Sequence, residues 1–523
     1  MMNSKVRLTM MTLMIGVFMG ALDNGIITSS LTTLIHSFGV SPSWGAWIIT
    51  IYTLGLTISV PIVGKLSDRY GRRALFLIEI SLFGIGSLLV ALSPTFTFLL
   101  IARFFQALGG GGIFILASSY ILDTFPKERQ GRALGMLGGM NGIASVLGPN
   151  IGSLILSVAG SWHWLFLINI PIAILLLILG SKSLEKQEVR STSRLDIAGI
   201  LVLSGASLSL MYGLTQLKGT SFKDVLTSAS FLTFVLVGIA MYVLFFFLEK
   251  RVETKGTEPV LPISMLKTPT YRWSLVLALL SGGILASVIF IPSYVEQYLG
   301  VASSMSGYWF TPLALAAGIG AAMGGIVIDK KGPTFTMFAA SIIAMIGYVL
   351  FPLWVEHTWQ MAIASIFVGI GFGTLIGAPI NMIATEHIQG NKGVALAGVS
   401  LIRQMGMTIA PTIYASFLTR GFAQFGEVLQ RNAAEAGVDL SQGGMAQLPK
   451  DADMTTLMSM IEQIPSKEVK ELLLKTVHDA SGIGFDGLFY AAAVVAAIML
   501  ITVIIVHQVR KRAGTPASSA HAK

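Results

Sequence analysis

A few ionisable side chains stand inside long apolar stretches, where they could carry protons or form ion pairs. Asp23 interrupts a largely apolar run over residues 8–22, and Arg103 lies within another apolar stretch. A carboxylate costs roughly 2.5–3.5 kcal/mol inside a bilayer, so its presence needs a reason. Because desolvation favours its neutral form and a nearby cation favours its charged form, such a carboxylate can bind and release a proton. We predict proton coupling at Asp23; the alternative is a packing residue that stays neutral or paired.

Arg103 is the candidate partner of Asp23. The first stretch ends near Ser30, seven residues past Asp23, and the fourth begins near Phe96, seven residues before Arg103. At about 1.5 Å of helix per residue, both side chains lie roughly 10 Å below the same surface. We therefore expect them to interact. The alternative is that backbone carbonyls and Gln106 satisfy the guanidinium.

Three further ionisable residues are candidates for a second proton or substrate site. Glu79 lies about two turns into the third stretch, where it could bind a proton or extend to the membrane surface. Glu296 lies at the outer end of its stretch, which favours an interfacial position. Arg403 is roughly 15 Å deep in the thirteenth stretch. It could attract an anionic group or brace the helices through backbone carbonyls and Gln404.

The elements that carry these residues are predicted to be transmembrane helices. Of the 523 residues, 12% are charged, about half the usual share in soluble proteins, and the mean hydropathy is +0.76. A soluble multi-domain enzyme is therefore excluded. Fourteen stretches reach the roughly 20 apolar residues that a span needs. They run near residues 8–30, 44–63, 74–92, 96–122, 132–158, 163–181, 196–216, 226–248, 273–298, 305–327, 334–354, 359–384, 394–418 and 486–508.

The basic residues predict the orientation of these spans. With the N-terminus in the cytoplasm, 25 of the 35 Lys and Arg residues fall in cytoplasmic segments. Cytoplasmic loops of membrane proteins are enriched in Lys and Arg. We expect both termini in the cytoplasm, a multi-pass protein of the cell membrane and no nucleic-acid partner despite the net charge of +9. The absence of cysteine excludes disulfides and thiolate catalysis.

Two pairs of segments recur at almost one offset. GKLSDRYGRR (64–73) matches GIVIDKKGPT (325–334), and GRALGML (131–137) matches GVALAGV (393–399). Duplicated halves are typical of transporters that rock about a midplane site. We predict a six-helix half over residues 1–190, two inserted helices over 191–255 and a second six-helix half over 256–523. The second half includes the outer loop 419–485 and the tail 509–523.

The segment 64–73 is predicted to form a gate. By the repeat, Asp68 could face the N-terminus of the thirteenth span near Gly393, where a carboxylate gains about 0.3–1 kcal/mol. Arg69 and Arg72 could pair with Asp123 at the inner end of the fourth span. The alternative is a turn that only carries positive charge. The gate residues are Gly64, Asp68, Arg69, Gly71, Arg72, Arg73 and Asp123.

The sequence resembles the major facilitator superfamily, in particular its fourteen-span drug:proton antiporter branch. Segment 64–73 fits the pattern G-x-L-x-D-R-x-G-R-R at every defined position. Further similar segments are LDNGIITSSLT (22–32), RFFQALGG (103–110), GPNIG (148–152), WHWLFLINIP (162–171) and EPVLPISML (258–266). The chain departs from the usual motifs at Gly25, where Thr is common, at Thr32 for Pro and at Ala107 for Gly.

The resemblance implies an all-α fold of two six-helix halves with two inserted helices. It also implies proton-driven export of hydrophobic or cationic compounds, with no cofactor besides the proton gradient and a monomer in contact with lipids. Gly148, Pro149 and Gly152 match its antiporter motif, and its span-four Arg, here Arg103, is tied to proton movement. The alternative is an exporter of lipids or lipid-linked molecules, which Arg403 and the outer loop would suit. We expect no enzyme, since the chain lacks a P-loop and an H-E-x-x-H motif.

Overall fold

The computed structural model describes residues 4–40, 42–45, 47–186, 196–215, 228–254, 259–301, 307–388, 391–436, 461 and 467–513. Regular structure in these ranges is helical. The first half contains α1 (Ser4–Phe38), α2 (Pro42–Gly45), α3 (Trp47–Tyr70), α4 (Arg72–Ala91), α5 (Phe96–Gly110), α6 (Ile113–Thr124), α7 (Lys127–Ala159), α8 (His163–Leu167) and α9 (Asn169–Ser183). The inserted helices are α10 (Ile197–Thr215) and α12 (Ala229–Thr254).

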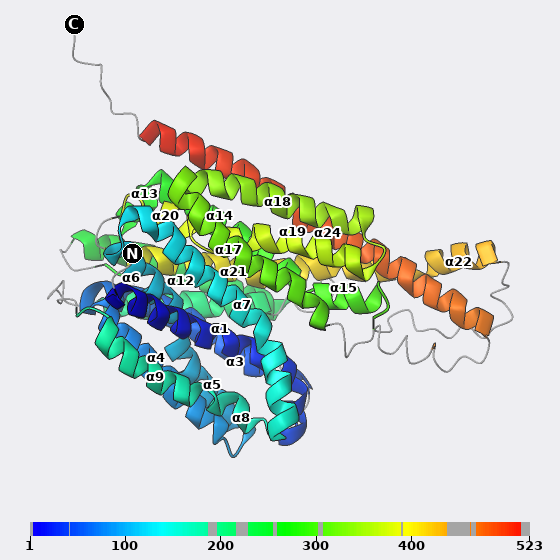
Figure 1. Ribbon diagram of the computed structural model, residues 1–523, viewed down its shortest axis with the longest axis horizontal. Helices are drawn as coiled ribbons and strands as arrows, with labels where there is room; N and C mark the ends of the chain where they lie inside the picture. Colours follow the sequence, from blue (N-terminus) through cyan, green and yellow to red (C-terminus); the bar gives the residue numbers. More distant parts are fainter. Residues whose placement is uncertain are drawn as a thin grey trace, which may run out of the picture.

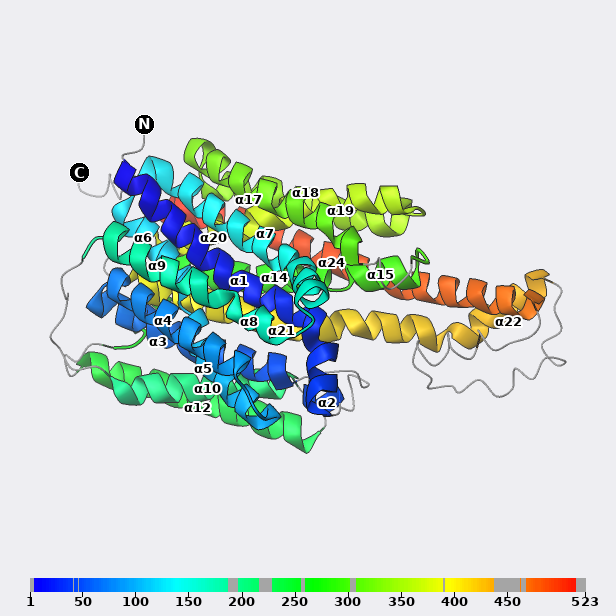
Figure 2. The same cartoon turned by 60° about the horizontal axis from the view of Figure 1, so that its bottom comes forward.

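The second half follows the inserted helices. It contains α13 (Ile263–Lys267), α14 (Pro269–Val288), α15 (Ile291–Gln297), η1 (Gly307–Phe310), α17 (Thr311–Lys331), α18 (Pro333–Trp354), α19 (Thr358–Ile376), α20 (Pro379–Thr385), α21 (Lys392–Ala423), α22 (Phe425–Ala436) and α24 (Lys467–Ala513). Figure 1 shows the two halves side by side, with α7 and α21 between them. In Figure 2, α10 and α12 pack against each other beside α3.

Within the described ranges, thirteen helical segments are long and apolar enough to cross a membrane, and a bent fourteenth brings the total to the predicted number. The bent one is α7, whose parts Lys127–Ser145 and Leu147–Ala159 meet at 41°. Pro149 explains the position of the bend, because its ring crowds the carbonyl four residues earlier and it donates no backbone hydrogen bond. The chain is therefore an all-α, multi-pass membrane protein.

One end of the bundle joins the two halves. We call it the terminal end, because α1 begins and α24 ends there (Figures 1 and 2). A core cluster built mainly from the first half also includes Ile328, Leu396 and Ala397 of the second half near this end. A larger core cluster lies wholly within the second half. The packing thus ties the halves together at the terminal end.

At the opposite end, α21 and α24 extend beyond the other helices (Figure 2). The short helix α22 packs on α24 through an apolar cluster that includes Leu429 and Leu473. Asn432 Nδ2 also donates to Asp479 Oδ2 at 2.9 Å. The apolar residues between Leu457 and Val477 predict one or two short amphipathic helices in the loop 419–485. The start of α24 supplies one of them, whereas α22 was not expected. Residues 437–460 and 462–466, with Leu457 and Ile464, lie outside the described residues.

Candidate functional site

Asp23 and Arg103 form a buried ion pair between α1 and α5. Arg103 Nη1 lies 2.7 Å from Asp23 Oδ2, and each side chain is 1% exposed. Gln106 Nε2 donates to Asp23 Oδ1 at 2.9 Å, and Asn169 Nδ2 of α9 donates to the same oxygen at 3.0 Å. The interaction that the sequence predicts is therefore present. Three donors therefore surround the carboxylate.

Arg103 also contacts groups other than Asp23. Its Nη1 donates to Gln106 Oε1 at 2.6 Å, so the alternative partner expected from sequence belongs to the same network. Its guanidinium lies 4.0 Å from the centroid of the Tyr52 ring and 5.6 Å from that of Phe166. A desolvated cation is stabilised over an aromatic face. Arg103 thus keeps favourable contacts that do not depend on the charge of Asp23.

Sequence reasoning missed Tyr52, Ser87 and Asn169 in this network. Ser87 Oγ of α4 accepts hydrogen bonds from Gln106 Nε2 at 2.7 Å and from Asn169 Nδ2 at 3.3 Å. Asn169 lies in the segment 162–171, which resembles a family motif, but the sequence alone does not assign it a role. The signal that could have found it is an amide within an otherwise apolar span, which is costly unless hydrogen-bonded.

Glu79 points into the first half, so the expectation that it extends to the membrane surface is wrong. Its side chain is buried at 2% exposure. Its Oε2 accepts a hydrogen bond from the backbone N–H of Gly112 at 2.9 Å. Gly112 is the N-cap of α6, whose first N–H groups have no partner within the helix. Glu79 therefore satisfies a buried helix N-terminus, and proton binding there stays a prediction.

The other two candidates lie apart from the ion pair. Glu296 is exposed on α15, as an interfacial residue should be. Arg403 is 8% exposed on α21, and its Nε donates to Ser281 Oγ at 3.2 Å. Ser281 replaces the expected Gln404 as its side-chain partner. Within the described residues, Nη2 of Arg403 is buried without a hydrogen bond.

Asp68 fastens the first half to the second at the terminal end. Its Oδ1 and Oδ2 accept the backbone N–H groups of Gly393 at 3.1 Å and Val394 at 3.0 Å, in the first turn of α21. Arg72 Nη2 lies 2.8 Å from Asp68 Oδ1 and 2.9 Å from Asp123 Oδ2. Both contacts that the sequence predicts for Asp68 and Arg72 are therefore present.

Neighbouring residues extend this gate. Lys392 Nζ lies 3.1 Å from Asp123 Oδ1, so Asp123 joins α6 to α21. Arg73 Nη2 donates to the carbonyl of Ser181 at 2.6 Å. The Arg69 guanidinium lies 5.3 Å from the centroid of the Tyr70 ring.

At two positions of the gate, any residue larger than glycine would clash with a neighbouring helix or strain the backbone. A Cβ on Gly64 would lie 2.7 Å from the Cβ of Ala397 and 2.9 Å from the carbonyl oxygen of Gly393, so α3 and α21 touch through this glycine. Gly71 has φ +88°, in the region that favours glycine, and it makes the turn between α3 and α4.

Asp329 forms a second fastening that sequence reasoning did not assign. Its Oδ1 accepts the backbone N–H of Gly131 at 2.9 Å, and its Oδ2 accepts that of Arg132 at 3.0 Å. Asp329 lies at the end of α17, and Gly131 lies near the start of α7. The repeat already aligned Asp329 with Asp68, and that alignment was the available signal.

The Gly-Pro segment of α7 packs on α1. A Cβ on Gly148 would lie 2.5 Å from the Cα of Gly25, and a Cβ on Gly25 would lie 2.7 Å from the carbonyl of Ser145. Gly152 is buried one turn further along. The glycine at position 25, where the resembling proteins commonly carry Thr, therefore accommodates this close contact between backbones.

Comparisons with known proteins show the family of this chain. The family model described as Major Facilitator Superfamily matches residues 13–411. The chain belongs to the major facilitator superfamily. Within this superfamily it is similar to the uncharacterized MFS-type transporter YfiU of Bacillus subtilis (strain 168), with 52% identity over 493 residues that cover 94% of this chain and 95% of YfiU.

Two further members of the superfamily illustrate its range. Multidrug resistance protein 3 of Bacillus subtilis (strain 168) is 29% identical over 518 residues, which cover 97% of this chain and 96% of that protein. The fucose:proton symporter FucP of E. coli has a solved structure with a TM-score of 0.59 and 14% identity. The match covers 96% of this chain and 99% of FucP, and it shows the shared fold. The relatives named here are transporters, so this chain is a multi-pass transporter of the same superfamily.

Proposed function

We propose that this protein exports hydrophobic or cationic compounds across the cell membrane in exchange for protons. The observation that carries the proposal is the Asp23–Arg103 ion pair, buried between transmembrane helices. Ionisable residues inside membrane spans mark proton or substrate pathways by default. The similarity to a multidrug resistance protein supports export as the direction and drugs as the cargo.

The proton step follows from the partners of the pair. The three donors around Asp23 stabilise its carboxylate, and a proton that binds Oδ2 removes the attraction to Arg103. Arg103 then keeps its hydrogen bond to Gln106 and its contact with the Tyr52 ring. These contacts compensate in part for the lost ion pair when Asp23 is neutral.

The gate couples this step to alternating access. Asp68 and Asp329 hold the terminal end closed in the present state, through contacts between the two halves. Alternating access in this fold is rocking of one half against the other about a fixed site. We propose that protonation of Asp23 favours release of these contacts, so that the terminal end opens and the proton leaves there.

The orientation rests on the distribution of charge. The excess of Lys and Arg lies in segments at the terminal end, which favours the cytoplasm on that side. The closed gate then faces the cytoplasm. A cationic substrate would compete with the proton for Asp23 only after Arg103 withdraws.

A substrate panel tests the proposal. The protein is reconstituted into liposomes with an inward or outward pH gradient, and fluorescent hydrophobic cations and neutral dyes are measured with and without an uncoupler. We expect dye transport to require the pH gradient. In the same experiment, dye transport should also dissipate the gradient. Dye movement indifferent to the uncoupler would exclude proton antiport.

A further inference from the structure

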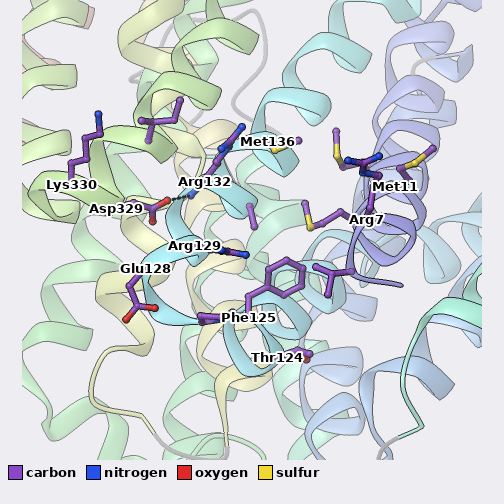
Figure 3. Close-up of a pocket in the computed structure, with 16 residues that line it drawn as sticks. Arg7, Met11, Thr124, Phe125, Glu128, Arg129, Arg132, Met136, Asp329 and Lys330 are labelled. Atoms are coloured by element: carbon purple, nitrogen blue, oxygen red, sulfur yellow. Dashed lines mark hydrogen bonds between the residues drawn. The ribbon is translucent and has the colours of Figure 1, made fainter. Parts of the chain in front are cut away.

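A groove at the terminal end lies beside the second gate contact. It encloses about 1010 Å³ between α1, the start of α7 and the end of α17 (Figure 3). Small-molecule pockets commonly hold about 300–1,000 Å³, so the groove can take a sizeable molecule. Its wall includes Asp329, which accepts the backbone N–H groups of Gly131 and Arg132. An occupant would therefore touch both halves of the transporter.

The groove has the same polarity gradient on all three helices. On α1, Arg7 is followed deeper along one face by Met10, Met11 and Met14. Residues three, four and seven positions apart share a helix face, and seven residues span about 10 Å. The same spacing recurs on α7, where Arg129 and Arg132 precede Ala133 and Met136, and on α17, where Ile326 is deeper than Lys330.

The basic groups of the groove are available to a ligand. Arg7, Arg129, Arg132 and Lys330 are exposed, and no ion pair joins their side chains to any residue that the structure describes. Two acids, Glu128 and Asp329, also line the groove. The Asp329 carboxylate is already bound by two backbone N–H groups, so cationic groups dominate the mouth of the groove.

We propose that this groove binds an anionic phospholipid from the adjacent leaflet. The phosphate would lie at the mouth of the groove, which the four basic side chains line, and an acyl chain would lie along the methionines, which adapt to an irregular apolar surface. Met11 and Met136 are 51% and 38% exposed, which leaves this apolar part open toward the membrane. Basic pockets between transmembrane helices are recognised binding sites for anionic headgroups.

The lipid would stabilise the closed gate. Arg7 belongs to the first half and Lys330 to the second, with Arg129 and Arg132 beside the Asp329 contact. Because Arg7 and Lys330 lie on opposite sides of the groove (Figure 3), their combined attraction for the phosphate is strongest when the halves are together at this end. A ligand shifts an equilibrium toward the state that it binds more tightly. The inference rests on the groove and the gate, and it does not depend on which substrate is transported.

Native mass spectrometry of the full chain tests binding. Dioleoylphosphatidylglycerol and dioleoylphosphatidylcholine are titrated into the detergent-solubilised protein, and glycerol phosphate serves as a soluble anion. We expect phosphatidylglycerol to bind selectively, and Arg129→Gln/Arg132→Gln to weaken it about tenfold or more. Arg7→Gln/Lys330→Gln should weaken binding to a similar extent. This second double variant keeps the test valid if the first one fails to fold. The control is Lys250→Gln/Arg251→Gln, which removes two exposed charges from α12.

Spin labels report the effect on the gate. The chain has no cysteine, so Lys182→Cys and Gln508→Cys give one label in each half. Phosphatidylglycerol nanodiscs should shorten the distance between the labels relative to phosphatidylcholine nanodiscs, and the groove variants should abolish this shift. Equal binding of the two lipids, competition by glycerol phosphate alone or an equal loss in the control variant would overturn the proposal. Transport assays play no part in these readouts, so they separate this proposal from the proposed export.

Discussion

Asp68 and Asp329, 261 positions apart, fasten the two halves by the same arrangement of hydrogen bonds. Each carboxylate accepts two consecutive backbone N–H groups near the start of a helix in the opposite half. The donor residues Gly393 and Gly131 are themselves equivalent in the repeat. The halves thus hold each other reciprocally. The Arg72–Asp123 pair reinforces only the first fastening, because Pro333 and Thr385 occupy the equivalent positions in the second half.

This reciprocity predicts the effect of Asp68→Asn and Asp329→Asn. An amide offers one acceptor oxygen and brings its own N–H donors against backbone donors, so each variant should open the terminal end. Asp68→Asn should have the larger effect, because it also leaves Arg72 with one carboxylate fewer. Labels at positions 182 and 508 measure the opening. Glu185→Gln is the control, since it removes an exposed carboxylate at the same end and exposed ion pairs contribute about 0–1 kcal/mol. An unchanged distance in Asp329→Asn would refute the second fastening.

The contact between α1 and α7 predicts a different outcome for two glycines of α1. A Cβ on Gly25 would meet backbone atoms at 2.7 Å and 2.8 Å, whereas a Cβ on Gly20 would lie 3.8 Å from its nearest neighbour, in Ile113. Gly25→Ala should therefore destabilise the protein by about 1–3 kcal/mol, as overpacking does. Gly20→Ala should be tolerated. Thermal unfolding in detergent measures both variants, and equal stability of the two would contradict the packing.

Gly148→Ala provides an independent check of the same contact. Its Cβ would lie 2.5 Å from the Cα of Gly25, and neither backbone can yield without separating the helices. We expect a loss of stability and of transport together. Gly142→Ala on the same helix is the control, because its nearest neighbour would lie at 3.9 Å. A Gly148→Ala protein with full transport would show that close packing of this motif is not required.

Glu79 is predicted to act as a helix cap. Glu79→Gln retains an oxygen that can accept the N–H of Gly112, so the fold and most of the transport should persist. Glu79→Leu leaves that N–H buried without a partner, which costs about 1–3 kcal/mol. Thermal unfolding and transport rates separate the two variants. A well-folded Glu79→Gln protein without proton-coupled transport would instead assign a second proton site to this residue.

The sequence predicts how deep a residue lies far better than which way it points. The depths of Asp23 and Arg103 follow from the rise per residue, and the Asp68 contact near Gly393 follows from the repeat. The direction of a side chain around its helix depends on packing between helices. For this reason Glu79, expected near the surface, points inward, and Arg403 contacts Ser281 rather than Gln404.

Other contacts were hidden because their residue types are unremarkable alone. Ser87 and Tyr52 are ordinary in an apolar span, and they join the ion pair only because α3, α4 and α5 pack together. The sequence around Asp329 looks like that of an ordinary acidic loop, because it does not show that the carboxylate contacts α7. Long-range packing therefore supplies the part of the site that local patterns leave undetermined.

Proton coupling at Asp23 is the central claim, and Asp23→Asn tests it most directly. Asn keeps the shape and can still accept from Arg103, but it does not titrate. Because loss of one partner leaves a buried charge, which costs about 3–5 kcal/mol, Asp23→Asn/Arg103→Gln is made in parallel as a variant without that charge. Glu296→Gln is the control, since it neutralises an exposed carboxylate.

The deciding measurement is dye-driven proton flux in proteoliposomes containing each variant, with folding checked by thermal unfolding. We expect that both Asp23 variants are folded and that dye no longer collapses the pH gradient, while Glu296→Gln behaves like the parent protein. A folded Asp23→Asn protein that moves dye at the parent rate and still dissipates the gradient would contradict this expectation.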